Sequence, residues 1–178
     1  MVRLVLLNGP PGVGKSTLAG RYLDEHPMTL TIEIDTLRMA MGGWAEHDES
    51  KLQARVSALA LARTHLGAGH DVIIPQYVGR PEFIDQLQAV AAEIGATFLH
   101  VLLKDGHDAV VQRFRSRRAQ LDADGLAHPQ ADVVAAEIDI AVTDAQRRLA
   151  EMASSRPEIR VVDVTAGDPY EQLINALR

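Results

Sequence analysis

The sequence predicts an α/β fold in which a parallel sheet of five strands carries helices on both faces. Short apolar runs alternate along the chain with longer segments whose apolar residues recur every three or four positions. Such alternation is typical of strand–helix–strand units with right-handed crossovers. Ligands of these sheets bind beyond the carboxyl ends of the strands, so the residues that follow each strand are the candidates for a site.

Each expected strand is a short apolar run that ends at turn residues, the pattern of a strand buried on both faces. The five runs occupy residues 2–8, 29–34, 72–74, 97–103 and 159–164. The second strand is followed by Asp35 and then by a segment that contains Gly42, Gly43 and Trp44. We expect that segment to be mostly loop with one helical turn.

Helices are expected where apolar residues return at helical spacing, at residues 15–25, 51–66, 83–94, 108–121, 132–152 and 170–177. The helix at 51–66 is expected to bury the face that carries Leu52, Val56, Leu59 and Leu66. The helix at 132–152 is expected to bury a stripe that begins at Val134.

The composition fits one domain of ordinary size, and we expect residues 1–178 to form it. The chain has 18 Lys and Arg residues against 24 Asp and Glu, a net charge of -6 that disfavours a protein built to hold nucleic-acid backbones. It has no cysteine, which excludes disulfides, zinc–thiolate sites and a cysteine nucleophile. No apolar run is long enough for a membrane span or a signal peptide, so we expect a cytoplasmic protein, either monomer or homodimer.

The turn after the first strand has the spacing of a phosphate-binding loop: a glycine, four residues, a glycine, a lysine and a serine. Glycines let successive backbone N–H groups point at an anion, and the N-terminus of the next helix faces the same point. Lys15 supplies a charge for the β- and γ-phosphates of ATP or GTP, and Ser16 a hydroxyl for Mg²⁺. The nucleotide is expected on Gly9, Pro10, Pro11, Gly12, Val13, Gly14, Lys15, Ser16 and Thr17.

Asp35 is the candidate general base, because strand two or three of such a sheet ends near the γ-phosphate. A carboxylate there can orient and deprotonate an acceptor hydroxyl. The alternative is that Asp35 caps a helical turn that begins at Thr36. Many P-loop enzymes also place an Mg²⁺-binding acid after strand three, but no acid follows Ile74 here. We therefore expect Mg²⁺ to rely on Ser16, the phosphates, water and Asp35.

Four arginines crowd the helix after the fourth strand: Arg113, Arg115, Arg117 and Arg118. Arg113 and Arg117 lie four residues apart on one flank, where they can clamp the transferring phosphoryl group. The alternative is a solvated basic face.

The phosphate loop, the segment Ile34-Asp35-Thr36-Leu37-Arg38 and the arginine-rich helix resemble the small P-loop kinases. This group includes chloramphenicol phosphotransferase, zeta toxins, gluconate and shikimate kinases, and AAA-type ATPases named for the loop. The resemblance implies the three-layer P-loop NTPase fold and transfer of the γ-phosphate of ATP to a small-molecule hydroxyl, with Asp35 as base.

The resemblance also implies three further features. Arg38 would contact substrate or phosphate, and residues 113–131 would form a small helical lid. The loop after the fifth strand, with Thr165 and Gly167, would pack on adenine; the alternative is that Asp168 caps the next helix, with Pro169 at its first position.

The acceptor site has several candidates. Gln76 can hydrogen-bond a neutral acceptor, and Arg80 can hold an anionic one. Trp44 and Tyr77 can line the pocket around it. The alternative for each of these residues is a purely structural role, in packing or in a loop. The identity of the acceptor stays open: it could be an antibiotic, a sugar or a nucleoside-type metabolite.

Two other classes of function remain as alternatives. One is a nucleotide-binding regulatory NTPase, and the other is an RNA-end kinase, which the net negative charge disfavours.

Overall fold

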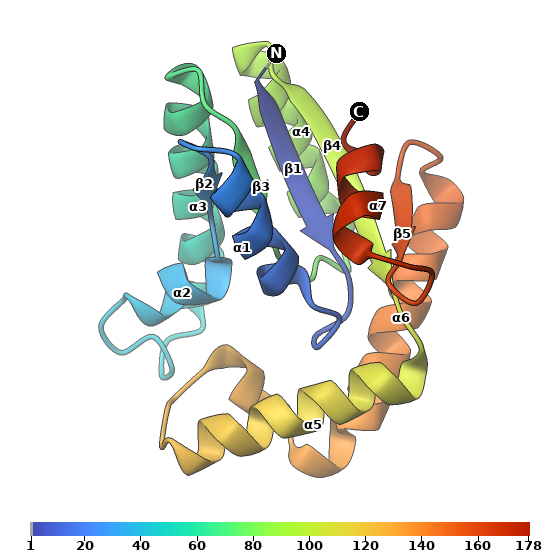
Figure 1. Cartoon of the computed structure of the whole chain (residues 1–178). Helices are drawn as coiled ribbons and strands as arrows, with labels where there is room; N and C mark the ends of the chain where they lie inside the picture. Colours follow the sequence, from blue (N-terminus) through green and yellow to red (C-terminus); the bar gives the residue numbers. More distant parts are fainter. Residues whose placement is uncertain (1) are drawn as a thin grey trace.

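The structure is a computed structural model that describes residues 2–178, except for the side chains of residues 131 and 132. Five strands form one sheet in the order β2-β3-β1-β4-β5, and all neighbouring strands are parallel (Figure 1). Their bounds are β1 (Arg3–Asn8), β2 (Leu30–Thr31), β3 (Val72–Ile74), β4 (Thr97–Lys104) and β5 (Arg160–Asp163). The predicted five-stranded parallel sheet is confirmed.

Helices cover both faces of this sheet, as predicted. One face packs against α1 (Lys15–Glu25) and α7 (Pro169–Ala176), and the other against α3 (Glu49–Gly67), α4 (Pro81–Ile94) and α6 (Ile138–Ser155). The central strand β1 contributes side chains to the apolar clusters on both faces of the sheet. Leu4 and Leu6 belong to one cluster, and Val5 and Leu7 belong to the other. The core is thus three-layered.

Two helices lie beyond the carboxyl ends of the strands, where ligands bind in such sheets (Figure 1). These are α2 (Ile34–Met39) and α5 (His107–Ala123). Two short 3-10 turns, Pro129–Asp132 and Ala135–Glu137, connect α5 to α6. A third apolar cluster holds α5 to α6, through Val110, Val111 and Phe114 on the first helix and Ile138 and Val142 on the second.

The segment after β2 differs from the expectation. The second strand was expected to reach residue 34, but β2 ends at Thr31 and a helix begins at Ile34. The apolar side chains Ile32 and Ile34 are buried on either side of this change, so their alternation looks like a continuing strand. The result places Asp35 in the first turn of α2.

The buried faces of two helices also differ. On α3, Leu52 and Val56 are 66% and 49% exposed, and the inward face consists of Ser50, Ala54, Ala58, Ala62 and Leu66. Small residues at every fourth position let a helix approach its neighbours closely. The positions of the large apolar side chains therefore identify the wrong face. Similarly, α6 begins only at Ile138, and Val134 lies before it with 57% of its surface exposed.

Asn8, at the end of β1, is fully buried, and its side chain forms hydrogen bonds with the phosphate loop, the segment after β3 and strand β4. Its Oδ1 accepts hydrogen bonds from the backbone N–H groups of Gly9, at 2.8 Å, and Val78, at 3.0 Å. Its Nδ2 donates to the carbonyl of Val78 at 3.0 Å and to Nε2 of His100 at 3.2 Å. His100 must therefore be neutral, and burial lowers its pKa to about 4. His100 is thus a buried core residue whose ring nitrogen has a hydrogen-bond partner.

We expect Asn8→Ala to lower the free energy of unfolding by about 2–4 kcal/mol, because it leaves several buried polar groups at β1 and Val78 without partners. Denaturant unfolding measures the change, and Asn175→Ala, at an exposed position on α7, is the matched control. An equally small effect of both variants would show that the buried amide does not hold this junction together.

Among the helices of residues 2–178, none combines the length and the apolar composition that a bilayer crossing requires.

Candidate active site

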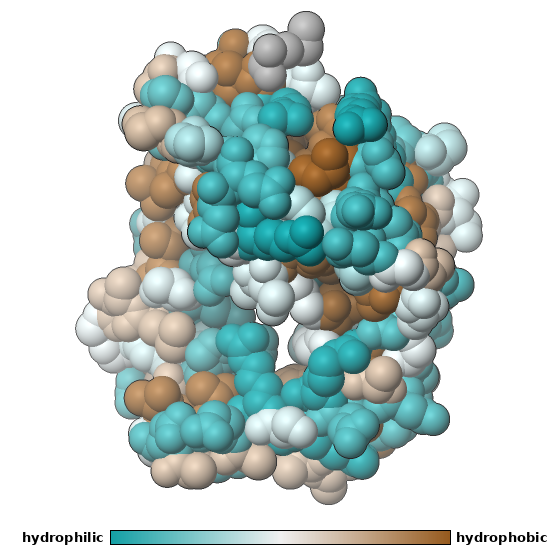
Figure 2. Space-filling model, in the orientation of Figure 1, coloured by the Kyte–Doolittle hydropathy of each residue, from teal (hydrophilic) through white to brown (hydrophobic). Residues whose placement is uncertain are grey.

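A cleft of about 390 Å³ opens at the carboxyl ends of the strands, between the phosphate loop and α5. Figure 2 shows a hollow between the sheet and α5, with hydrophilic side chains along its α5 side. The lining residues come from the phosphate loop, the start of α2, the segment after β3, α5 and the connection to α6. They are Pro11, Gly12, Gly14, Lys15, Ser16, Thr17, Glu33, Asp35, Pro75, Gln76, Tyr77, Arg113, Phe114, Arg117, His128, Pro129, Gln130 and Val133.

The phosphate loop packs directly on α5 at a position that only glycine can occupy. Gly12 has a φ of +86°, and a Cβ there would lie 2.9 Å from the carbonyl oxygen of Val110 and 3.1 Å from the backbone nitrogen of Phe114. The loop ends at Gly14, which has a φ of +100° at the N-cap of α1. The glycines therefore shape the turn and also let α5 close over it.

Lys15 begins α1 and turns back over the loop. Its Nζ donates to the carbonyl oxygens of Gly9, at 2.9 Å, and Pro10, at 3.0 Å. Burial lowers the pKa of this ammonium to about 7; Asp35 and Glu33 act in the opposite direction, and Arg117 adds to the lowering. A desolvated cation surrounded by loop carbonyls is suited to receive phosphate oxygens.

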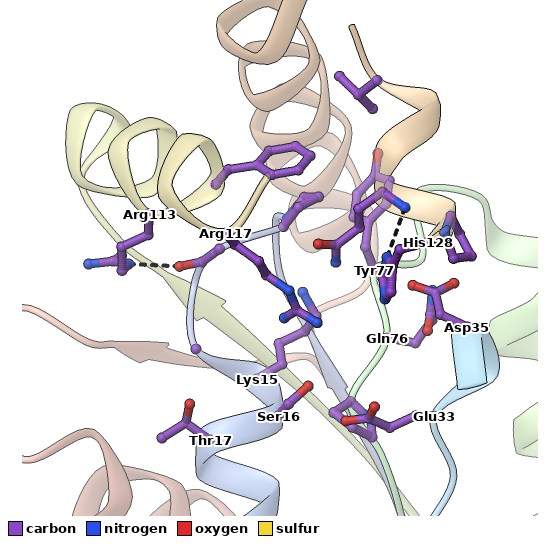
Figure 3. A pocket seen from close by; sticks show the side chains of 18 residues that line it. Lys15, Ser16, Thr17, Glu33, Asp35, Gln76, Tyr77, Arg113, Arg117 and His128 are labelled. Atoms are coloured by element: carbon purple, nitrogen blue, oxygen red, sulfur yellow. Dashed lines mark hydrogen bonds between the residues drawn. The ribbon is translucent and has the colours of Figure 1, made fainter. Parts of the chain in front are cut away.

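Two carboxylates face the loop from the start of α2. Glu33 occupies the N-cap position and Asp35 the first turn, so Asp35 is not the cap that the alternative interpretation required. Burial raises the pKa of Asp35, whereas His128, Arg38, Lys15 and Arg117 act to lower it. In Figure 3 both carboxylates point into the cleft opposite Lys15 and Ser16. Asp35 is thus a partly buried carboxylate beside the expected position of the phosphates.

The donor groups in the cleft fit a magnesium ion bound together with phosphates. The exposed hydroxyl of Ser16 and the carboxylates of Glu33 and Asp35 line one space, and oxygen is the ligand that Mg²⁺ prefers. Among the described residues, no group of three or more His, Asp or Glu side chains could hold a metal by itself. Mg²⁺ is usually bound through one or two carboxylates, water and substrate phosphates.

Arg113 and Arg117 both reach the cleft, but from different directions. Arg113 is fixed by the protein itself: its Nε donates to the carbonyl of Gly12 at 2.7 Å and its Nη2 pairs with the buried carboxylate of Asp105. Arg117 extends from α5 toward Lys15 (Figure 3). Arg118 instead pairs with Asp122 at 2.9 Å and donates to the carbonyl oxygen of Val133. The phosphate clamp thus stays a prediction, with Arg117 as the better placed of the two.

We expect Asp105→Asn to weaken ATP binding about 3- to 10-fold, since Arg113 would lose a charge-assisted hydrogen bond that holds it against the loop. Calorimetric titration with ATP measures the affinity. Asp108→Asn, an exposed acid on the same helix, is the control, and an equal effect of the two variants would contradict the role of Asp105.

The far side of the cleft includes residues that the sequence did not indicate as site residues, although two of them lie within the expected lid. Gln76 and Tyr77 line it, as the sequence suggested, and His128, Gln130 and Val133 join them from the connection to α6. The backbone N–H of Gln130 donates to Nδ1 of His128 at 3.1 Å. No motif marks this connection, and only the fold brings it opposite α2.

Three residues expected at the substrate lie outside the cleft. Arg38 is only 6% exposed; its Nε donates to Oγ of Ser50 at 3.0 Å, and its guanidinium lies over the ring of Trp44 at 4.8 Å. Trp44 lines a separate shallow hollow with Met41 and others. Arg80 is exposed at the N-cap of α4 and does not line the cleft.

Thr165 and Gly167 lie in the loop between β5 and α7 and do not line the cleft. The carboxylate of Asp168 accepts from the backbone N–H of Tyr170 at 2.8 Å, which confirms that it caps α7 with Pro169 at the first turn. The adenine contact stays a prediction.

Three comparisons place this site among known proteins. A family model described as an AAA domain matches residues 4–137. The chain is 32% identical over 133 residues to an adenylate kinase of Jannaschia sp. (strain CCS1), covering 68% of this chain and 69% of that protein.

Two solved structures share the fold over nearly the whole chain. The tunicamycin resistance protein of Deinococcus radiodurans has a TM-score of 0.58 at 19% identity, covering 99% of this chain and 94% of that one. A gluconokinase from Sinorhizobium meliloti 1021 has a TM-score of 0.56 at 18% identity, covering 97% and 88%. The chain therefore belongs to the AAA domain family, and it has the fold of the small P-loop kinases that its sequence resembles.

Proposed function

We propose that this protein is a small-molecule kinase that transfers the γ-phosphate of ATP to a hydroxyl group, with Asp35 as the general base. The observation that carries the proposal is the position of Asp35. Its partly buried carboxylate faces the same cleft as Lys15 of the phosphate loop, on the side where an acceptor can enter. Phosphoryl transfer depends mainly on positioning and on stabilising charge, and this cleft has groups for both.

In the proposed step, the acceptor oxygen attacks the γ-phosphorus while the bond from that phosphorus to the β–γ bridging oxygen breaks. Asp35 accepts the hydroxyl proton, and ADP leaves. Lys15 holds the β- and γ-phosphates, and Arg117 stabilises the charge that develops on the transferred group. When Mg²⁺ is bound, it neutralises phosphate charge, and Ser16, Glu33 and Asp35 would hold it.

The related proteins support a phosphotransferase of this kind. The names adenylate kinase and gluconokinase denote enzymes that phosphorylate small molecules. A regulatory NTPase is the alternative, but the cleft extends past the phosphate loop to Gln76, Tyr77 and Gln130, a wall that hydrolysis alone does not need.

ADP production measured with and without pools of hydroxyl compounds tests this function. A kinase should release ADP slowly alone and much faster in one pool, with a stoichiometric phosphorylated product. An ADP rate that no pool changes, together with a partner protein whose binding depends on ATP or ADP, would instead identify a regulatory NTPase.

Transfer should also depend on pH through Asp35. The base acts only when ionised, and burial raises its pKa above the ordinary 3.8, so kcat/KM should fall as pH decreases through this raised value. The acid limb of a kcat/KM profile with magnesium–ATP held saturating measures it. A profile that stays flat down to pH 4 would place the base elsewhere.

A further inference from the structure

The outer face of α3 carries apolar side chains that the rest of the fold leaves at the surface. We define the α3 stripe as Leu52, Val56 and Leu59. Leu52 and Val56 are exposed, and Leu59 is partly buried. The contact of this helix with the core is made by its opposite face, through alanines and Leu66. Thus α3 is apolar on two faces, whereas a helix at the surface of a domain is normally apolar on one.

The α3 stripe has the spacing of a seam between two helices. Its members are four and three residues apart, which places them in line along one side of the helix. Ala60 is exposed one turn after Val56, and a small side chain there lets another helix approach closely. At the other end the stripe adjoins a shallow hollow that Leu52 lines together with Met41 and Trp44. Figure 2 shows apolar side chains along the left edge of the molecule, where α3 runs in Figure 1.

The two ends of the α3 stripe carry opposite charges. Glu49 lies about one turn before Leu52, and Arg63 lies about one turn after Leu59, both exposed. Glu49 is seven residues before Val56, and Arg63 is seven residues after it. A second α3 laid antiparallel across Val56 would therefore bring opposite charges together at both ends. A parallel copy would bring like charges together, which disfavours that arrangement.

Both charged groups can make this contact. Among the residues that the structure describes, the carboxylate of Glu49 has no hydrogen-bond or ion-pair partner. Arg63 pairs with Glu93 through Nε at 3.0 Å and Nη2 at 2.9 Å, which holds its guanidinium at the surface and leaves Nη1 for a second carboxylate.

We propose that the α3 stripe is a docking surface for a second copy of this chain, packed antiparallel about a two-fold axis at Val56. A two-fold contact requires that, if one residue meets a second, the second also meets the first. Val56 would meet its own copy, and Leu52 would meet Ala60 of the partner subunit. Glu49 would meet Arg63 of the partner subunit. The reversal of charge about Val56 fits this symmetry, which a surface for an unrelated protein would not need.

The size of the surface limits the strength of the dimer. At 1.5 Å per residue, the 19 residues of α3 span about 28 Å. A seam of this length buries less than the roughly 800 Å² per partner of a standard stable interface. We therefore expect a concentration-dependent dimer with a Kd on the order of 10–100 µM.

Single cysteines test the register directly, because the chain has no cysteine of its own. Under oxidation by copper–phenanthroline, Val56→Cys should form a disulfide-linked dimer, since the axis brings its two copies together. Leu52→Cys alone should not, because its two copies lie about 12 Å apart along the seam, beyond the reach of a disulfide. A mixture of Leu52→Cys and Ala60→Cys should again give a linked dimer.

Equal linkage of Leu52→Cys and Val56→Cys would show a parallel or non-specific contact and would overturn the proposal. Absence of linkage in both Val56→Cys and the mixture would overturn it as well.

Sedimentation equilibrium tests the association itself. The wild-type protein should show a mass that rises toward that of a dimer with concentration, and Val56→Glu, which places two carboxylates at the axis, should raise the Kd at least about 10-fold. Ile140→Glu, at an exposed apolar position on α6, is the matched control and should leave the Kd unchanged. Thermal unfolding checks that both variants keep the fold.

Two outcomes of this measurement would contradict the proposal. A wild-type mass that stays that of a monomer up to about 500 µM would show that the α3 stripe does not bind a second copy and would leave it to a different protein. An equal effect of Val56→Glu and Ile140→Glu would place the contact elsewhere. Neither outcome bears on the kinase function, because no residue of the α3 stripe lines the cleft.

Discussion

Replacing Asp35 by asparagine is expected to lower kcat for phosphoryl transfer by about 10²–10⁴-fold, the usual contribution of a general base. Asparagine keeps the size of the side chain and much of its hydrogen bonding but cannot accept the hydroxyl proton. The affinity for ATP should change only several-fold, since Lys15 and the loop amides hold the phosphates. Steady-state kinetics with an identified acceptor, together with calorimetry for ATP, separates the two effects.

Asp24→Asn is the matched control, because it removes one exposed carboxylate from α1 outside the cleft. If Asp35→Asn kept the wild-type kcat, the base would be another acid of the cleft. Glu33 lines the cleft two residues earlier and would be the next to replace.

Lys15→Ala is expected to weaken ATP binding by about 30-fold or more. The side chain is a partly buried amine held over the phosphate loop, it takes up a proton fully once phosphates are bound, and removing one partner of such a charge pair costs at least about 2 kcal/mol. Calorimetric titration measures the loss, and circular dichroism checks that the fold is intact. Lys15 contacts only the carbonyls of Gly9 and Pro10 among the hydrogen bonds of the described residues, so the fold should tolerate the change.

Lys51→Ala is the control for this variant. Lys51 is exposed on α3, pairs with Asp48 at 2.9 Å and does not line the cleft, so its removal should leave ATP binding unchanged. Wild-type ATP affinity in folded Lys15→Ala would contradict the assignment of residues 9–17 as the phosphate loop.

The sequence was most informative where local spacing determines local geometry. The glycine-rich turn, its lysine and the helix that follows are contiguous, so their pattern alone predicts their arrangement. The parallel sheet follows from the alternation of apolar runs and helical periods, and the buried strands β1, β3 and β4 lie where those runs were found.

The side of the cleft away from the phosphate loop could not be predicted in this way, because it depends on where distant segments meet. His128 and Gln130 follow α5 in a polar stretch without a motif, and only the packing of α5 on α6 brings them opposite Asp35. Arg38 shows the converse. Its spacing from Asp35 suggests a substrate contact, but α2 is a helix and places Arg38 against Ser50 instead.

Packing faces were misjudged for a related reason. On α3 two of the four apolar residues expected to be buried, Leu52 and Val56, are exposed, and alanines make up most of the inward face. Periodicity identifies the existence of a helix more securely than the face it buries when small residues form the contact.

The central claim, transfer of the γ-phosphoryl group to a hydroxyl at Asp35, is tested most directly by following labelled oxygen. ATP that carries ¹⁸O at the non-bridging γ-oxygens is incubated with the protein, Mg²⁺ and pools of hydroxyl compounds, and the products are analysed by mass spectrometry. The account predicts a phosphomonoester that contains the three labelled oxygens and an ester oxygen from the acceptor, formed by the wild-type protein and nearly lost with Asp35→Asn. Label found only in inorganic phosphate, or equal product from both proteins, would contradict it.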